Sequence, residues 1–271
     1  MITLGIDIGS RNTKIVFYDT SNQSILFSAW SATEVNPLQS VHSLLKQAKN
    51  SYGLDLPEEI ACTGYGRKLW KGNSKVFSEI TCHTTGVRYF IPEVRTIIDV
   101  GGQDAKIISL TPEGKIKDFV MNDKCAAGTG RFLEMVAGRL EVSLDELSEL
   151  ALQSKNPLTI SSTCVVFAES EIIGMIAKNT DPADIAYAAH ISIAKRIITQ
   201  LSAVDFTPPI VFTGGVAQNK NLVQCLSELL NTTIITPPNP EITGALELLF
   251  SFLKPKNIIN SSENNRIDNI V

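Results

Sequence analysis

Apolar residues occupy every second position between Ile2 and Ile8, a period that predicts a β-strand. The Gly9-Ser10 pair then predicts a turn, and residues 14–18 are again extended and apolar. The chain is therefore expected to begin with a β-hairpin that has a polar tip.

The same strand–turn–strand pattern returns in the middle of the chain. Residues 96–100 form an apolar segment that ends at Gly101-Gly102, and residues 105–110 are extended and apolar again. Two similar hairpins suggest two lobes built on one plan, which face each other across a cleft.

The rest of the pattern assigns elements to both lobes. We expect a first lobe over residues 1–95 and a second over residues 96–242, with a boundary near residues 92–95. A helix over residues 243–254 is expected to complete the first lobe, and the polar, Asn-rich residues 255–271 are expected to be disordered. The other expected elements are helices at 41–51, 126–140, 144–153, 165–179 and 182–201 and strands at 60–63 and 210–213.

Composition indicates a globular protein that binds neither nucleic acid nor a membrane. The 271 residues are 44% apolar, which is enough for folded cores. The 24 Lys and Arg against 28 Asp and Glu give a net charge of −4, with no long basic run to neutralise a phosphate backbone. The longest nearly apolar stretch, residues 242–253, is too short for a bilayer and contains Glu247. Asp7 stands where a signal peptide would be hydrophobic, so a cytoplasmic location is expected.

Two of the expected turns have the composition of a phosphate site. In Asp7-Ile8-Gly9-Ser10 and in Asp99-Val100-Gly101-Gly102-Gln103-Asp104, a carboxylate at a strand end is followed by glycine. Glycine lets backbone N–H groups approach an anion, and the carboxylate can hold Mg²⁺ through water. Lys14 adds a positive charge near the first turn. Two such turns, facing each other, are expected to hold a triphosphate.

A third glycine turn, Gly214-Gly215, follows the strand at 210–213 and can admit a flat ring against its backbone. The three turns, in this order, resemble the first phosphate, second phosphate and adenosine motifs of the superfamily of sugar kinases, heat-shock chaperones and actin. The resemblance implies an α/β fold with two ribonuclease H-like lobes. No G-x-x-x-x-G-K-[ST] motif is present to support a Walker-type site.

The resemblance assigns roles to individual residues in the cleft. Gln103 or Asp104 would orient the attacking water, unless this pair only caps its own turn. Gln218 either lines the adenine side or begins a helix. The expected nucleotide-binding residues are Asp7, Gly9, Ser10, Arg11, Thr13, Lys14, Asp99, Gly101, Gly102, Gln103, Gly214, Gly215 and Gln218.

Two of the five cysteines lie in polar surroundings that do not suit a protein core. Cys125 and Cys164 each precede an expected helix, whose N-terminus favours a thiolate. Cys62, Cys82 and Cys225 are expected to be small buried hydrophobes. A four-iron, four-sulfur cluster needs four thiolates, so one such pair per chain suggests a cluster shared by two copies.

A more specific resemblance rests on six segments: GIDIGSRNTK, TGYGR, IDVGGQDAK, MNDKCAAGTGRFLE, ISSTCVVFAESE and TGGVAQN. Over about residues 1–250 the chain resembles the ATP-dependent activators of 2-hydroxyacyl-CoA dehydratases, relatives of benzoyl-CoA reductase ATPase subunits and of the reductases of double-cubane cluster proteins. The resemblance implies a homodimer in which Cys125 and Cys164 of both chains hold one [4Fe-4S] cluster. It also implies ATP and Mg²⁺ as cofactors.

The same resemblance implies a function in electron transfer. One electron from ferredoxin or flavodoxin would pass to a partner iron–sulfur enzyme, a dehydratase or a double-cubane cluster protein, while ATP is hydrolysed. Two alternatives on the same fold are a small-molecule kinase, with Asp104 as its base, and a nucleotide-dependent interaction module that binds no cluster. The kinase alternative leaves both cysteine segments without a purpose.

Overall fold

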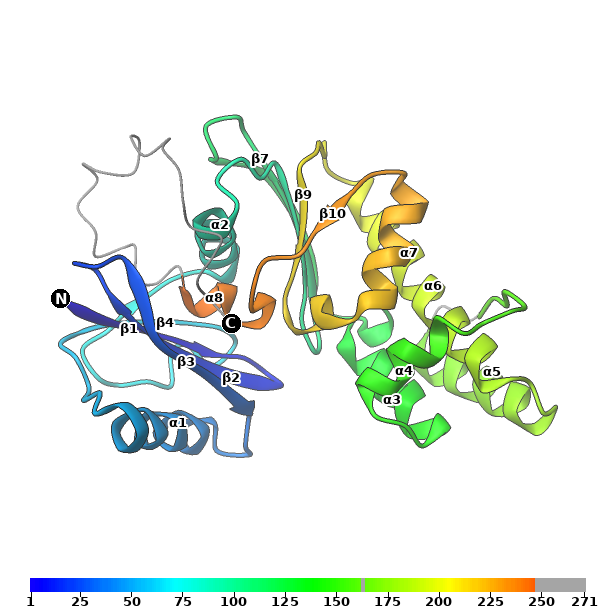
Figure 1. Ribbon diagram of the computed structural model, residues 1–271, viewed down its shortest axis with the longest axis horizontal. Coiled ribbons are helices and arrows are strands. Elements are labelled where there is room, and N and C mark those ends of the chain that lie inside the picture. The colour runs from blue at the N-terminus through cyan, green and yellow to red at the C-terminus, as the bar shows by residue number, and fades with distance from the viewer. Residues whose placement is uncertain (162–163, 247–271) are drawn as a thin grey trace.

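Two five-stranded sheets stand side by side in the computed structural model, which describes residues 1–161 and 164–246 (Figure 1). Each has a central strand with an antiparallel meander on one side and two parallel strands on the other. The first sheet has the order β3 (Ser24–Ala32), β2 (Asn12–Asp19), β1 (Ile2–Ile8), β4 (Glu59–Thr63), β5 (Lys75–Val76). The second has the matching order β8 (Ile116–Asn122), β7 (Ala105–Leu110), β6 (Thr96–Val100), β9 (Ile210–Thr213), β10 (Ile234–Ile235).

The matching order confirms the repeat that the sequence predicts, and it extends to single residues. In the first sheet Asp7 of β1 lies opposite Lys14 of β2, and in the second sheet Asp99 of β6 lies opposite Lys106 of β7. Each lobe therefore presents an Asp–Lys pair at the same place, where its central strand ends.

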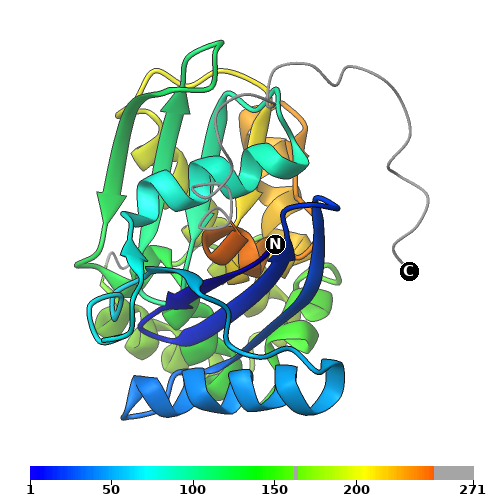
Figure 2. The ribbon, with the colours of Figure 1, turned by 90° about the vertical axis from the view of Figure 1, so that its left-hand side faces the viewer.

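Helix α1 covers one face of the first sheet (Figure 2). Asn36 caps its start by accepting a hydrogen bond from the Leu38 N–H, and Gly53 ends it in the left-handed conformation with φ 67°. Between these ends, Val41 and Leu44 are buried against the sheet. The helical segments among the described residues are α1 (Pro37–Tyr52), α2 (Glu79–Phe90), η1 (Ala126–Gly128), α3 (Gly130–Leu140), α4 (Leu144–Ala151), α5 (Val165–Ala177), α6 (Pro182–Leu201), η2 (Gly215–Gln218), α7 (Lys220–Leu230), η3 (Pro240–Ile242) and α8 (Thr243–Leu246).

The largest core lies between the second sheet and the helices from α3 to α7 (Figure 1). It contains the aromatic rings of Phe132 and Phe212 and the aliphatic side chains of Ile107, Ile193 and Leu222, all fully or almost fully buried. Burial of a Phe or Ile side chain contributes about 1.5–3 kcal/mol. This core therefore fixes how α3 and α5, the helices that follow the two candidate cysteines, lie on the second lobe.

Helices α2 and α8 lie between the two sheets (Figure 1). Val87 of α2 packs with Ile97 of the second sheet, although α2 precedes that sheet in the sequence. Leu246 of α8 packs on the first sheet, although α8 follows the second. The two helices meet so closely that a Cβ atom on Gly86 would lie 1.9 Å from the carbonyl oxygen of Thr243. Each sheet is thus covered by a helix that belongs in sequence to the other lobe: α2 packs on the second sheet and α8 on the first.

The expectation of one continuous helix over residues 126–140 is wrong, because the helical conformation is interrupted. The chain forms η1, becomes extended at Thr129 (φ −134°, ψ 173°), and only then begins α3. The interruption has a tertiary cause, because the Thr129 hydroxyl and the N–H of Arg131 donate hydrogen bonds to the carbonyl oxygen of Gly102, and the N–H of Gly130 donates to Gly101. These bonds fasten the start of α3 to the second glycine turn.

Most other expected elements are confirmed: α6 and β9 have the expected bounds, and α4 and α5 end two residues earlier than expected. Helices α2 and α7 and strands β3 and β8 are additional to the expectation. The expected helix at 243–254 is described only as far as Leu246, and its remainder and the tail lie outside the described residues. Within the described part of the chain, no helix has the length and apolar content needed to cross a bilayer.

Candidate nucleotide site and cysteine segments

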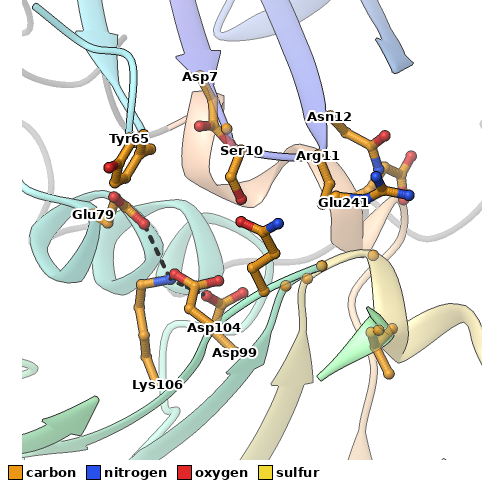
Figure 3. Close-up of a pocket in the computed structure, with 18 of the residues that line it drawn as sticks. Asp7, Ser10, Arg11, Asn12, Tyr65, Glu79, Asp99, Asp104, Lys106 and Glu241 are labelled. Carbon is orange, nitrogen blue, oxygen red and sulfur yellow. Dashed lines mark hydrogen bonds and ion pairs between the residues drawn. The ribbon is translucent and has the colours of Figure 1, made fainter. Parts of the chain in front are cut away.

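A cavity of about 1160 Å³ lies where the glycine turns of the two lobes face each other (Figure 3). Its wall includes all but one of the residues expected to bind nucleotide, and also Asp104. They are Asp7, Gly9, Ser10, Arg11, Lys14, Asp99, Gly101, Gly102, Gln103, Gly214, Gly215 and Gln218. The cavity is large enough for a cofactor-sized ligand.

Thr13 is the exception, since it lies behind the first turn. Its side chain is buried, and its hydroxyl shares a hydrogen bond of 2.9 Å with the Thr33 hydroxyl, which in turn donates to the carbonyl oxygen of Gly9. Thr13 therefore supports the shape of the turn from β2.

The first half of the cavity is built on one ion pair. Lys14 donates a hydrogen bond of 2.8 Å to Oδ2 of Asp7. Burial disfavours the charged lysine, but the Asp7 carboxylate outweighs burial and raises the pKa of Lys14. The loop after β4 closes over this pair, because a Cβ atom on Gly64 (φ 87°) would lie 2.4 Å from Asp7 Oδ1. Only glycine fits there.

The second half holds a larger charge cluster. The Lys106 amine lies 3.2 Å from Asp99 Oδ2, 3.1 Å from Glu79 Oε2 and 2.5 Å from Asp104 Oδ2 (Figure 3). Burial disfavours the charged amine, but these three carboxylates outweigh burial and raise the pKa of Lys106. His83 reaches the same cluster, with Nε2 3.4 Å from Asp99 Oδ2. One buried ammonium thus joins β6, its following turn and the start of α2.

Asp99 has one oxygen left over. Burial disfavours its ionisation, but the charges of His83, Lys106 and Lys14 outweigh burial and lower the pKa of this carboxyl. Its Oδ2 is engaged by Lys106, whereas Oδ1 is buried and has no hydrogen-bond partner among the described residues. A buried, ionised oxygen at a cavity wall suits a hydrogen bond from a metal-bound water.

Glu79, His83 and Lys106 are functional candidates that the sequence reasoning missed. Lys106 could have been found from the sequence, because it follows Asp99 by the same seven positions that separate Lys14 from Asp7. Glu79 and His83 could not, because α2 reaches the cavity only through the packing of the two lobes.

The third turn lines the cavity beside the second one, because β9 pairs with β6. Gly214 has φ 86°, and a Cβ atom there would lie 2.4 Å from the carbonyl oxygen of Val100, whereas Gly215 has open space around it. Gln218 is held at the rim by a hydrogen bond of 3.2 Å from Nε2 to Glu241 Oε2. The open backbone at Gly215 leaves room for a flat ring.

The five cysteines divide by exposure as the sequence predicts. Cys62, Cys82 and Cys225 are buried, and burial raises the pKa of Cys62 to about 11 and of Cys225 to about 12. Cys125 and Cys164 are exposed. Cys164 is the N-cap of α5 and Cys125 that of η1, and neither side chain makes a capping hydrogen bond. Both thiols are therefore accessible to a ligand or a partner.

No group of three or more metal-binding side chains gathers among the described residues of a single chain. A site built on Cys125 and Cys164 would therefore need ligands from elsewhere, such as a second copy. The helices that follow the two cysteines are in contact, since Arg139 in the last turn of α3 donates a hydrogen bond of 2.8 Å from Nε to Glu169 of α5.

Comparison with solved structures first identifies the fold. The chain matches a sugar kinase of the ROK family, the glucokinase of Streptomyces griseus, with a TM-score of 0.56 at 13% identity, over 92% of this chain and 98% of that one. At this identity the likeness shows the fold alone, which is the two-lobed α/β fold of actin-like ATPases and sugar kinases.

The family follows from closer matches. Residues 4–246 match the BadF/BadG/BcrA/BcrD ATPase family, and the chain belongs to this family. The activator of lactoyl-CoA dehydratase from Anaerotignum propionicum is 43% identical, over 91% of this chain and 95% of that protein. The solved activator of the 2-hydroxyisocaproyl-CoA dehydratase from Clostridium difficile, with bound ADPNP, has a TM-score of 0.84 at 40% identity, over 92% of each chain. The family resemblance expected from the sequence is confirmed.

Proposed function

We propose that this protein is an ATP-dependent reductive activator, which passes single electrons to a partner iron–sulfur enzyme as it hydrolyses ATP. The observation that carries the proposal is the direct bonding of the second glycine turn to the start of α3, next to Cys125. A nucleotide in the cavity would thus touch the same backbone that positions an exposed thiol. Relatives that are named dehydratase activators support this proposal.

Different residues of the cavity would bind the phosphates, the Mg²⁺ ion and the adenine ring of Mg-ATP. The backbone of Gly9-Ser10 and of Gly101-Gly102 would bind phosphate oxygens, and Lys14 would add charge. Mg²⁺ suits this site because Asp7 and the unpaired Asp99 Oδ1 offer oxygen atoms to its water shell. When bound, the ion would neutralise charge on the phosphates. Gly214 and Gly215 would admit the adenine ring, with Gln218 beside it.

Gln103 and Asp104 remain the proposed catalytic pair, with different roles. The Asp104 carboxylate is engaged by Lys106, so it would keep that amine in place and fix the turn. Gln103 lines the cavity and is exposed to it, so it is the better candidate to orient the attacking water. Glu79, which also lines the cavity beside Lys106, is a further candidate for contact with that water.

Cys125 and Cys164 would hold a [4Fe-4S] cluster together with the same two residues of a second copy, which makes the protein a homodimer. Both thiols are exposed, and Cys164 also begins α5, where free N–H groups and the helix dipole favour the negative charge of a ligated cluster. The cluster would supply one-electron transfer. Its donor would be ferredoxin or flavodoxin, and its acceptor a 2-hydroxyacyl-CoA dehydratase or a double-cubane cluster protein.

The test is a measurement of iron and acid-labile sulfide on protein purified without oxygen, with an electron paramagnetic resonance spectrum after reduction by dithionite. We expect about four iron atoms per dimer, lost in Cys125→Ala and in Cys164→Ala but kept in Cys225→Ala, the matched control. ATP-binding protein without iron would contradict the proposal and favour a kinase or an interaction module on the same fold.

A further inference from the structure

An ion pair crosses the cavity from the first glycine turn to α3. Arg11, between β1 and β2, donates a hydrogen bond of 2.6 Å from Nη2 to Oε2 of Glu134. Arg131 of α3 lies 3.4 Å from the same oxygen. Both Arg11 and Glu134 line the cavity. The first lobe is thus joined to the helix that follows Cys125 by a contact that a nucleotide would meet.

The arginine is guided across the cavity by the second glycine turn. A Cβ atom on Gly102 would lie 2.4 Å from Cγ of Arg11, so the arginine stem rests on the Gly102 backbone. Nε of Arg11 is buried and has no hydrogen-bond partner among the described residues. The guanidinium of this cavity-lining arginine therefore has one N–H group without a partner among the described residues.

Helix α3 carries this contact towards both cysteine segments. At its start, the Thr129 hydroxyl lies 3.1 Å from the carbonyl oxygen of Gly102 and 2.8 Å from that of Ala126, the residue after Cys125, so its one proton is shared between them. Near its end, Arg139 binds Glu169 of α5, the helix that begins after Cys164. Loss of the ion pair between Arg11 and Glu134 would therefore act on α3, which contacts the Cys125 segment at its start and α5 near its end.

We infer that Glu134 is a positioning residue that holds Arg11 across the cavity and yields it to the terminal phosphate of a bound nucleotide. A guanidinium binds phosphate through parallel hydrogen bonds, and phosphate carries more charge than a carboxylate. The exchange frees α3 from the first lobe when nucleotide binds. This inference rests on the proposed nucleotide site, and it assigns to one residue the link between that site and the cysteine segments.

The first test is a double-mutant cycle on the affinity for ADPNP, with Arg11→Gln, Glu134→Gln and the double variant. Glu134→Gln removes the competitor for Arg11, so we expect affinity to rise about threefold, as suits a half-exposed ion pair. In the Arg11→Gln background, Glu134→Gln should have no effect. Glu149→Gln, which removes an equal charge on neighbouring α4, is the control and should leave affinity unchanged.

The second test is hydrogen–deuterium exchange in α5, which does not line the cavity. ADPNP should change the exchange of α5 in the wild-type protein. Without nucleotide, Glu134→Gln and Arg11→Gln should both already show the exchange of the nucleotide-bound wild type, because each removes the contact. Glu149→Gln should respond as the wild type does.

Two results would overturn the inference while the proposed function stands. One is an equal gain in affinity from Glu134→Gln with and without Arg11, which would make the effect one of general charge. The other is wild-type exchange in α5 of both nucleotide-free variants. If the wild-type protein bound no ADPNP, the proposed function would fail, and the inference with it.

Discussion

The two halves of the cavity share one plan but differ in how their lysines are held. Among the described residues, Lys14 forms an ion pair with one carboxylate, that of Asp7, which lies on its own hairpin. Lys106, at the equivalent position, has three carboxylate partners, from β6, from its turn and from α2. The first half is thus complete within one hairpin, whereas the second is an assembly of distant segments. The repeated hairpin therefore supplies an Asp–Lys pair in both lobes. Tertiary packing then adds further carboxylates to the second pair only, so that Lys106 links several elements.

Removal of Lys106 should reduce the free energy of unfolding more than any other change proposed here. Lys106→Met leaves three carboxylates without their buried partner, and an uncompensated buried charge costs about 3–5 kcal/mol. Lys14→Met should cost less, because its pair is more exposed, 17% against 2% for the lysine side chain. Urea unfolding of both variants measures the difference.

A partial rescue provides the control for this prediction. Asp104→Asn in the Lys106→Met background removes one of the unpaired charges, so it should recover part of the lost free energy of unfolding. Equal losses in Lys14→Met and Lys106→Met would show that the extra partners of Lys106 contribute nothing.

The third turn offers a test of backbone geometry beside the second half only. Gly214→Ala places a Cβ at φ 86° and 2.7 Å from Asp99 Oδ1, so it should cost about 2 kcal/mol and weaken ADPNP binding. Gly215→Ala meets nothing within 4 Å and should leave the stability within about 0.5 kcal/mol. Urea unfolding and ADPNP titration of this pair are the measurements. Similar values for the two variants would contradict the geometric argument.

The second lobe should also be the more sensitive to acid. His190 of α6 is buried, and burial lowers its pKa despite hydrogen bonds to the Ala186 carbonyl and the Asn219 side chain. The unfolded chain takes up a proton near pH 6.5, whereas the folded protein resists it to lower pH. This stability is fully present above about pH 6.5 and falls below it by at most about 1.4 kcal/mol per pH unit.

Urea unfolding at pH 7.5 and pH 5.5 tests this dependence. His190→Gln removes the titrating group, so the loss of stability between the two pH values should be smaller in the variant than in the wild type. An identical loss in both would assign the acid sensitivity to other groups.

The smallest expected effect concerns the contact between the helices of the two cysteine segments. The Arg139 side chain is 49% exposed and that of Glu169 30%, so Arg139→Gln should cost no more than about 1 kcal/mol in urea unfolding. It should nevertheless increase hydrogen exchange at the start of α5, because Glu169 lies in the first turns of that helix. Lys117→Gln, which breaks an exposed pair with Asp205 away from both cysteines, should leave α5 unchanged.

Much of the site could be predicted from the sequence, because the patterns that mark it are short and local. A carboxylate at a strand end followed by glycine is a short pattern, and it placed Asp7, Gly9, Asp99 and Gly101 correctly around one cavity. Thr13 shows the weakness of the same reasoning, because a residue next to a turn can point behind it.

The alternating apolar residues and the glycine turns determined the two hairpins, β1–β2 and β6–β7, because each hairpin depends on neighbours within a few positions. Only the tertiary structure decided that α2 would bring Glu79 and His83 to the second half, and that Thr129 would interrupt a helix. Both depend on contacts between distant segments: the packing of α2 on the second sheet and the hydrogen bonds of Thr129 to Gly102. Such contacts leave no periodic trace in a sequence, since their free energy is gained only when the lobes are assembled.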